Sequence, residues 1–228
     1  MGTFFFTPRC ILAYVFFASL LGTTLSASST TLTLKNGDTV ILIGKNDGLL
    51  KTVKRENNKY SDISEFFISH GQKNGSKIKE GDNKTPEGVY FATGIMTKND
   101  LREDLPKEIY GTYAIPLNYP NPIDKKRGNS GHGIWLHGTD SEEKLSGKNI
   151  TKGCIIMENS NINQLVNNIR VMKTPIVISS SLKDIKLGNN DTDKTFISFR
   201  SASERYKVTI LAAEGLEKKA KVLYEETK

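Results

Sequence analysis

The sequence predicts a mainly β protein with one or two short helices. Short apolar runs rich in isoleucine, valine and threonine recur along the chain, separated by turns that contain glycine or proline. Only one internal segment, beginning near Asn159, spaces its apolar residues at helical intervals. The chain has 228 residues without an internal repeat, which is enough for one domain with a substantial core.

The N-terminal part is predicted to consist of strands joined by tight turns. Asn36-Gly37 and Asn46-Asp-Gly48 separate apolar runs, and these residue types adopt positive φ angles at low cost, which is typical of hairpins. Thr85-Pro-Glu-Gly88 is a predicted turn that closes a polar loop over 72–84. The strands predicted here are 31–34, 39–43, 49–53, 66–69 and 89–93.

The middle of the chain contains another predicted strand at 113–119. Its apolar side chains alternate onto one face, but Pro116 lacks an amide hydrogen, which favours an edge strand or a bulge. A charged loop over 98–108 precedes this strand, and a turn over 119–124 follows it.

The next strand, 133–137, places Trp135 and His137 on one face. Asn159 or Ser160 is a plausible cap for the single predicted helix. The apolar face of that helix consists of Ile162, Leu165, Val166 and Ile169. The remaining predicted elements are strands at 175–179 and 206–211 and a helix or strand at 215–224.

The N-terminus is predicted to be a cleavable signal peptide over 1–27. Arg9 precedes an apolar run that ends at Leu21, and small residues follow, with cleavage expected after Ala27. The run is shorter than the roughly 20 residues of a spanning helix, so an uncleaved anchor is the alternative. Cleavage would leave an exported protein with no membrane segment.

The charge and motif content exclude several functional classes. A net charge of +7 suits an anionic surface such as a cell wall, but the basic residues are scattered and do not form stripes with aromatic residues, so nucleic-acid binding is not expected. The chain lacks the His-Glu-x-x-His, Cys-x-x-Cys and dinucleotide-binding motifs. We therefore expect neither a metal nor a cofactor, and the sequence does not specify the oligomeric state.

Cys154 is the main candidate for a nucleophile. The chain has two cysteines, and loss of Cys10 with the leader would leave Cys154 as the only thiol. A free thiol is mostly protonated at neutral pH and needs a base. His137 ends a strand shortly before Cys154, so the two side chains could meet at the ends of neighbouring strands. His132 lies roughly 16 Å from His137 along an extended strand of about 3.3 Å per residue, and His70 ends a different strand, so both are weaker candidates.

The residues before Cys154 could support it. Gly153 would let a substrate approach the sulfur closely, and the amides of Gly153 and Cys154 are natural donors to an oxyanion. The Thr151 hydroxyl could orient this loop. The competing interpretation is that Cys154 is a buried apolar residue in a non-catalytic module that binds the cell wall.

Three motifs in order resemble the L,D-transpeptidase catalytic domain (YkuD-like) family of bacterial cell-wall enzymes. They are Thr85-Pro-Glu-Gly88, Ile134-Trp-Leu-His-Gly-Thr139 and Thr151-Lys-Gly-Cys-Ile155. The resemblance implies a mainly β, sandwich-like or barrel-like catalytic domain that acts on peptidoglycan stem tetrapeptides in the periplasm or cell wall of a bacterium. The corresponding division of the chain is a signal peptide over 1–27, a catalytic domain over 28–181 with its core at about 40–179, and an unassigned extension over 182–228.

The resemblance also implies residue roles. Cys154 would attack the carbonyl of the third stem residue and expel terminal D-alanine, with His137 as base and the backbone carbonyl of Gly138 holding the imidazole tautomer. An amine acceptor would then give a crosslink, whereas water would give trimming. Candidate oxyanion or loop residues are Gly153, Thr151 and Lys152, and candidate substrate-binding residues are Trp135, Tyr113 and Thr139.

The chain departs from the common family pattern Ser-His-Gly-Cys-Ile-Arg. Thr151, Lys152 and Ile156 replace serine, the second histidine and arginine. Its Gly-Ile-Trp-Leu-His-Gly-Thr motif is similar to the branch that includes L,D-carboxypeptidases, which trim tetrapeptides to tripeptides in helical bacteria. Carboxypeptidase activity is therefore the alternative to transpeptidation.

Overall fold

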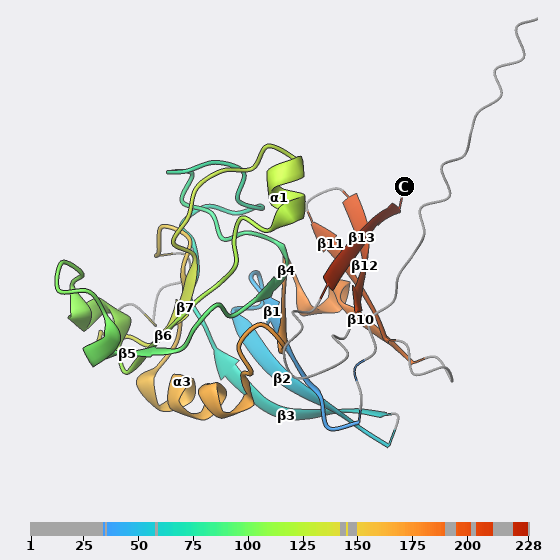
Figure 1. Ribbon diagram of the computed structural model, residues 1–228, viewed down its shortest axis with the longest axis horizontal. Coiled ribbons are helices and arrows are strands. Elements are labelled where there is room, and N and C mark those ends of the chain that lie inside the picture. Colours follow the sequence, from blue (N-terminus) through green and yellow to red (C-terminus); the bar gives the residue numbers. More distant parts are fainter. Residues whose placement is uncertain are drawn as a thin grey trace, which may run out of the picture.

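Three β-sheets account for most of the regular structure in the computed structural model (Figure 1). The structure describes residues 34, 36–57, 59–141, 145, 150–189, 195–201, 204–211 and 221–227. The first sheet contains β1 (Thr39–Gly44), β2 (Leu49–Glu56), β3 (Lys59–Phe67), β4 (Gly88–Phe91) and β9 (Pro175–Ser179). The second contains β5 (Met96–Thr97), β6 (Tyr113–Pro116), β7 (Trp135–His137) and β8 (Ile155–Ile156).

Helical segments are short and lie between the strands. They are α1 (Pro122–Lys126), α3 (Asn159–Leu165) and the 3₁₀ turns η1 (Lys98–Asp100), η2 (Lys107–Tyr110), η3 (Val166–Asn168) and η4 (Leu182–Asp184). The third sheet contains β10 (Lys186–Asn189), β11 (Thr195–Ser201), β12 (Glu204–Leu211) and β13 (Lys221–Thr227). The prediction of a mainly β fold with short helices is confirmed.

The centre of the first sheet is buried on both faces. Its strand order is β3-β2-β1-β9-β4, with β1 parallel to β9 and the other neighbours antiparallel. Ile41 and Ile43 point into the main core, whereas Val40 and Leu42 belong to a second cluster on the opposite face. This burial explains why β1 is an almost continuous apolar run and not an alternating one.

The main core joins the first sheet, the second sheet and α3. Ile115 of β6, Leu136 of β7 and Ile155 of β8 are fully buried in it, together with Ile162 and Leu165 of α3. The second sheet has the order β5-β6-β7-β8, and β7 and β8 run parallel. One face of β7, which ends at His137, and of β8, which begins directly after Cys154, is therefore packed against the core.

The third sheet lies in the extension expected after residue 181. Its four strands are antiparallel, and β11 contacts β9 of the first sheet. The predicted strand at 206–211 is confirmed within β12. Of the predicted helix or strand at 215–224, the described part is a strand, because β13 begins at Lys221.

Several predicted boundaries are wrong for identifiable reasons. The strand expected at 66–69 is the end of the longer β3, which the polar residues of its exposed face obscured. The turn expected at 119–124 contains the start of α1, where the side chain of Asn121 caps the amides of Ile123 and Asp124. The six-residue β1 and the five-residue β9 match their predicted runs closely.

The expected cap of α3 is also displaced. The N-cap is Glu158, because the Asn159 side chain accepts a hydrogen bond from the amide of Thr112 at 2.9 Å instead. The prediction of an edge strand at Pro116 is wrong for β6 as a whole, since β6 pairs with β5 and β7. Only Tyr113 and Ala114 of β6 pair with β5. Pro116 lies beyond them, so its missing amide hydrogen removes no hydrogen bond between β6 and β5.

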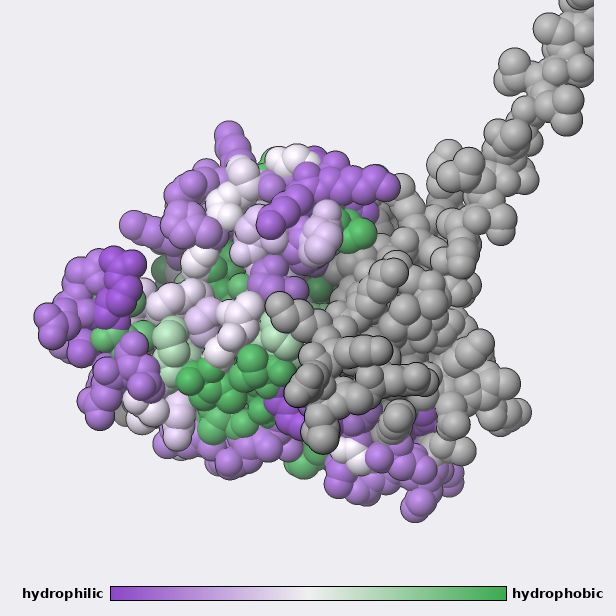
Figure 2. Space-filling model, viewed as in Figure 1, coloured by the Kyte–Doolittle hydropathy of each residue, from purple (hydrophilic) through white to green (hydrophobic). Residues whose placement is uncertain are grey.

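The predicted signal peptide at 1–27 and the predicted strand at 31–34 lie outside the described residues, apart from Leu34. Within the part that the structure describes, no helix combines the length and apolarity needed to cross a membrane. On the face seen in Figure 2, hydrophilic residues surround an apolar area near the segment between η3 and β9.

Candidate functional site

The pairing of β7 with β8 brings the proposed nucleophile and base onto one face of the second sheet. In this parallel pair Leu136 lies opposite Ile155, and His137 lies opposite Ile156. Leu136 and Ile155 both point into the core and are fully buried. Because side chains alternate along a strand, Cys154 lies on the same face as His137, on the neighbouring strand.

The Cys154 thiol lies in a partly buried position directly before β8. Its sulfur donates to the carbonyl of Gly133 at 3.4 Å. Burial raises the pKa of the Cys154 thiol above its ordinary value, although a backbone hydrogen bond from Trp135 and the charge of Lys77 act in the opposite direction. The thiol is therefore protonated at neutral pH in the free protein, and attack on a substrate requires a base.

The His137 imidazole is buried and held in one orientation. Its Nδ1 lies 2.6 Å from the carbonyl oxygen of Gly138, and His137 is only 6% exposed. A carbonyl oxygen can only accept, so Nδ1 carries the hydrogen, and in the neutral ring Nε2 carries the lone pair. A general base for the Cys154 thiol requires this tautomer, because Nε2 can then accept the thiol proton.

Tyr110, at the end of η2, is a site residue that the sequence did not indicate. Its ring packs at 4.9 Å from Trp135 and edge-on at 5.0 Å from His137, measured between ring centroids. Burial, and then the charge of a Cys154 thiolate, raise the pKa of the Tyr110 hydroxyl. The residue follows a segment predicted only as a charged loop, and no local pattern connects it with residues of β7.

The loop that precedes Cys154 is closed by the Thr151 hydroxyl. This hydroxyl accepts from the amide of Gly153 at 3.0 Å and donates to the carbonyl of Cys154 at 2.6 Å. In this structure the Gly153 amide is thus bound to Thr151, so its expected role as an oxyanion donor stays a prediction. No described residue accepts from the amide of Cys154, while the Lys152 side chain is exposed.

The other candidates take different positions. The Trp135 ring is tilted against the Tyr110 ring, and Tyr113 of β6 packs against the main core while remaining partly exposed. Thr139 is buried and lines a cavity of about 600 Å³. The other residues that line this cavity are Asp140, Leu145, Glu158 and Asn159.

The two remaining histidines do not join Cys154. His132 is exposed and lies 3.6 Å from a carboxylate oxygen of Glu80. His70 is buried, with Nε2 at 2.9 Å from the carbonyl of Lys45. Burial, and then the charge of Lys45, lower the pKa of His70, which favours the neutral ring.

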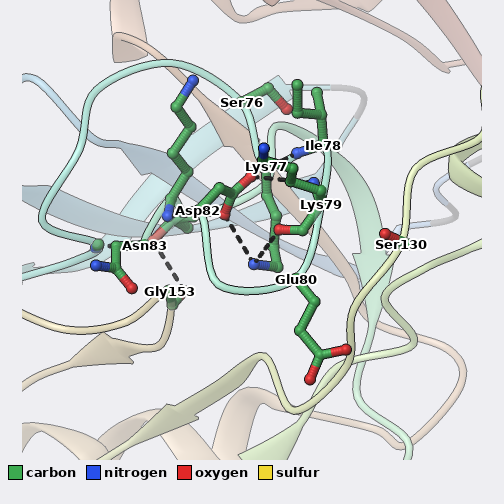
Figure 3. A network of polar contacts seen from close by, with 12 residues as sticks. Ser76, Lys77, Ile78, Lys79, Glu80, Asp82, Asn83, Ser130 and Gly153 are labelled. Carbon is green, nitrogen blue, oxygen red and sulfur yellow. Dashed lines mark hydrogen bonds and ion pairs between the residues drawn. The ribbon is translucent and has the colours of Figure 1, made fainter.

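The polar loop over 72–84 lies beside the Cys154 loop and is organised by Asp82 (Figure 3). The carboxylate accepts from the amides of Ile78, Lys79 and Lys84 and from the ammonium of Lys77 at 2.9 Å. Burial by itself would raise the pKa of Asp82, but these four donors outweigh it and hold the pKa at about 2. Asp82 thus fixes the backbone of this loop and holds the ammonium of Lys77, whose charge acts on the Cys154 thiol.

We expect Asp82 to make stability pH-dependent below pH 4. A depressed carboxyl pKa stabilises the fold above the ordinary value of about 3.9, and that contribution is lost as the pH falls through about 2. Asp82→Asn should lower the free energy of unfolding by about 2 kcal/mol at pH 7. In urea unfolding, the variant should also lose less stability than the wild type between pH 4 and pH 2. Asp62→Asn, which removes an exposed carboxylate, is the control. Equal pH profiles for both variants would contradict this expectation.

Comparison with known proteins identifies the family of the chain and structures of similar fold. Residues 38–178 match the L,D-transpeptidase catalytic domain family, YkuD. No curated protein matches the sequence significantly. The fold is similar to that of Bd1075 from Bdellovibrio bacteriovorus, with a TM-score of 0.54 and 20% identity over 86% of this chain and 95% of that one.

A second similar structure is the helical cell shape determining protein Pgp2 from Campylobacter jejuni. The TM-score is 0.58, with 20% identity over 87% of this chain and 91% of that one. At this identity the likeness establishes the fold alone. The family match, by contrast, spans more than half of the sequence and includes both strands of the site. The chain therefore belongs to the L,D-transpeptidase catalytic domain (YkuD) family of cysteine-dependent enzymes that act on peptidoglycan.

Proposed function

We propose that the protein is an exported L,D-transpeptidase that cleaves peptidoglycan stem tetrapeptides through an acyl-enzyme at Cys154. The observation that carries the proposal is the placement of Cys154 and His137 on one face of paired strands, with Nδ1 of His137 bound to Gly138. The raised pKa of the thiol makes this base necessary. Family membership supports the peptidoglycan substrate.

In the first half-reaction, Nε2 of His137 removes the thiol proton as the sulfur attacks the carbonyl carbon of the third stem residue. The amide of Cys154 donates to the oxyanion that forms. The carbon–nitrogen bond to D-alanine then breaks, and the imidazolium returns the proton to the leaving amine. The products are free D-alanine and a thioester at Cys154.

The second half-reaction depends on the acceptor. An amine of another stem gives a crosslink, whereas water gives a tripeptide and thus L,D-carboxypeptidase activity. Ile156, which stands where the common family pattern has arginine, is 2% exposed, so this position offers no cation to an acceptor. Together with the fold similarity to a helical cell shape determining protein, this favours trimming as the second candidate.

Purified protein incubated with tetrapeptide muropeptides tests the proposal. We expect free D-alanine and a thioester adduct on Cys154 in the intact mass spectrum. Crosslinked dimers would identify the transpeptidase, and tripeptides without dimers would identify the carboxypeptidase. Release of D-alanine that persists in Cys154→Ala would overturn the mechanism. N-terminal sequencing of the protein from cells separately tests export and cleavage after Ala27.

We expect Tyr110 to support His137 through its ring. Two aromatic contacts are worth about 0.5–1.5 kcal/mol each, so Tyr110→Ala should lower kcat/KM for D-alanine release about tenfold. Tyr110→Phe keeps both ring contacts and should retain most of the activity. A loss in Tyr110→Phe as large as in Tyr110→Ala would show that the hydroxyl, and not the packing, is required.

A further inference from the structure

A buried hydroxyl connects the Thr-Pro-Glu-Gly turn to the residue that precedes the nucleophile. Thr85 is fully buried. Its Oγ1 accepts from the amide of Gly71 at 2.9 Å and donates to the carbonyl of Gly153 at 2.9 Å. Because the hydroxyl hydrogen is directed at Gly153, this bond fixes the direction of the Gly153 carbonyl.

Thr85 is itself held firmly by a buried ion pair. The Lys45 ammonium donates to the carbonyl of Thr85 at 3.0 Å and to that of Gly75 at 2.6 Å, and it pairs with Glu87 at 2.8 Å. The side chains of Lys45 and Glu87 are 2% and 1% exposed. The hydroxyl of Thr85 therefore belongs to a rigid support.

The Gly153 carbonyl and the Cys154 amide belong to the same peptide unit. In a planar trans peptide the C=O and N–H bonds point in opposite directions. A carbonyl drawn towards Thr85 therefore turns the N–H of Cys154 away from the Thr-Pro-Glu-Gly turn. This is the amide for which no described residue provides an acceptor, whereas the amide of Gly153 is bound to Thr151.

We propose that Thr85 is a positioning residue whose hydroxyl orients the Cys154 amide as the donor to the oxyanion. The proposal rests on the proposed function only in taking Cys154 as a nucleophile that is acylated. Thr85 touches neither the substrate nor the sulfur and acts only through the Gly153–Cys154 peptide. Loss of its hydroxyl should therefore slow reactions that form an oxyanion more than reactions that do not.

Two reagents separate these effects. The Cys154 thiolate attacks p-nitrophenyl acetate at the carbonyl carbon, forming a thioester and expelling p-nitrophenolate, so an oxyanion forms on the way. Iodoacetamide alkylates the same sulfur by displacing iodide without any oxyanion. In Thr85→Val we expect acetylation to fall at least about tenfold while alkylation changes less than about twofold. Neither reagent requires recognition of a stem peptide, so failure of the proposed substrate would not affect this comparison.

Matched variants exclude a general loss of structure. Thr85→Ser keeps the hydroxyl and should keep the ratio of acetylation to alkylation within about threefold of wild type. Thr52→Val removes another fully buried threonine hydroxyl, one without a hydrogen-bond partner among the described residues, and should leave the ratio unchanged. Equal losses with both reagents in Thr85→Val, or an unchanged ratio, would overturn the proposal. If Thr85→Val does not fold, a changed ratio in Thr85→Ser would overturn it as well.

Discussion

Replacing His137 with glutamine is expected to slow acylation of Cys154 by about 10²- to 10⁴-fold at pH 7, the range for a general base. Burial raises the pKa of the thiol, so without the base little thiolate forms at neutral pH. The residual rate of His137→Gln should rise with pH as hydroxide deprotonates the thiol, and the two proteins should converge at alkaline pH. A carbapenem, whose β-lactam ring can acylate a nucleophilic thiol, serves as the probe. Intact mass spectrometry of the Cys154 adduct at successive times and pH values measures the acylation rates of the wild type and of His137→Gln.

His132→Gln is the matched control for His137→Gln. His132 lies on the same segment but is exposed, with its ring beside Glu80 and not beside the thiol. Its replacement should leave the acylation rate within about twofold of wild type, as expected for a surface residue. An unchanged rate in His137→Gln, or a pH profile parallel to that of wild type, would remove His137 from the role of base.

Replacing Gly153 with alanine is expected to inactivate the protein and to destabilise it by roughly 1–3 kcal/mol, the range for a residue forced into an unfavourable backbone region. Gly153 has φ of +137°, which side chains rarely adopt. An added Cβ would also lie 2.8 Å from the carbonyl oxygen of Lys84 and 2.9 Å from Cδ1 of Ile134. The resulting shift moves the carbonyl that Thr85 binds and the amide of Cys154 with it. Thermal unfolding and the acylation rate measure the two effects.

Gly94→Ala is the control for Gly153→Ala. A Cβ on Gly94 would have no described atom within 4 Å, and no positive φ is needed there. The substitution should leave activity unchanged and stability unchanged or slightly improved. An active and fully stable Gly153→Ala would show that the close approach of the Lys84 and Gly153 backbones is not required.

Because the pKa of the Cys154 thiol is raised, the alkylation rate alone does not distinguish an enzyme from an inert module that binds the cell wall. Slow alkylation at neutral pH does not by itself identify an inert thiol, because a catalytic thiol with a raised pKa also alkylates slowly until its base removes the proton. Acylation by a substrate-like probe, together with its dependence on His137, is therefore the decisive measurement.

The strands at the centre of the fold could be predicted because their own sequences favour a buried strand. β1 and β9 are apolar, β-branched runs bounded by turn residues, and the structure places them where the pattern does. β3 was underestimated, because its polar and exposed residues do not resemble a strand buried on one face. The cap of α3 was misplaced, because Asn159 bonds to Thr112, which is distant in the sequence.

The sequence by itself determined the family and the mainly β fold, and it singled out Cys154 and His137 as the proposed pair, because each of these is visible in short local motifs. Only the tertiary structure decided that Tyr110 packs on His137, that Thr151 occupies the amide of Gly153, and that Thr85 holds its carbonyl. These contacts join residues from separate loops, and a hydroxyl or aromatic ring has the same local pattern whether it faces solvent or a catalytic loop. Burial, which sets the thiol pKa, likewise arises only when the sheets pack together.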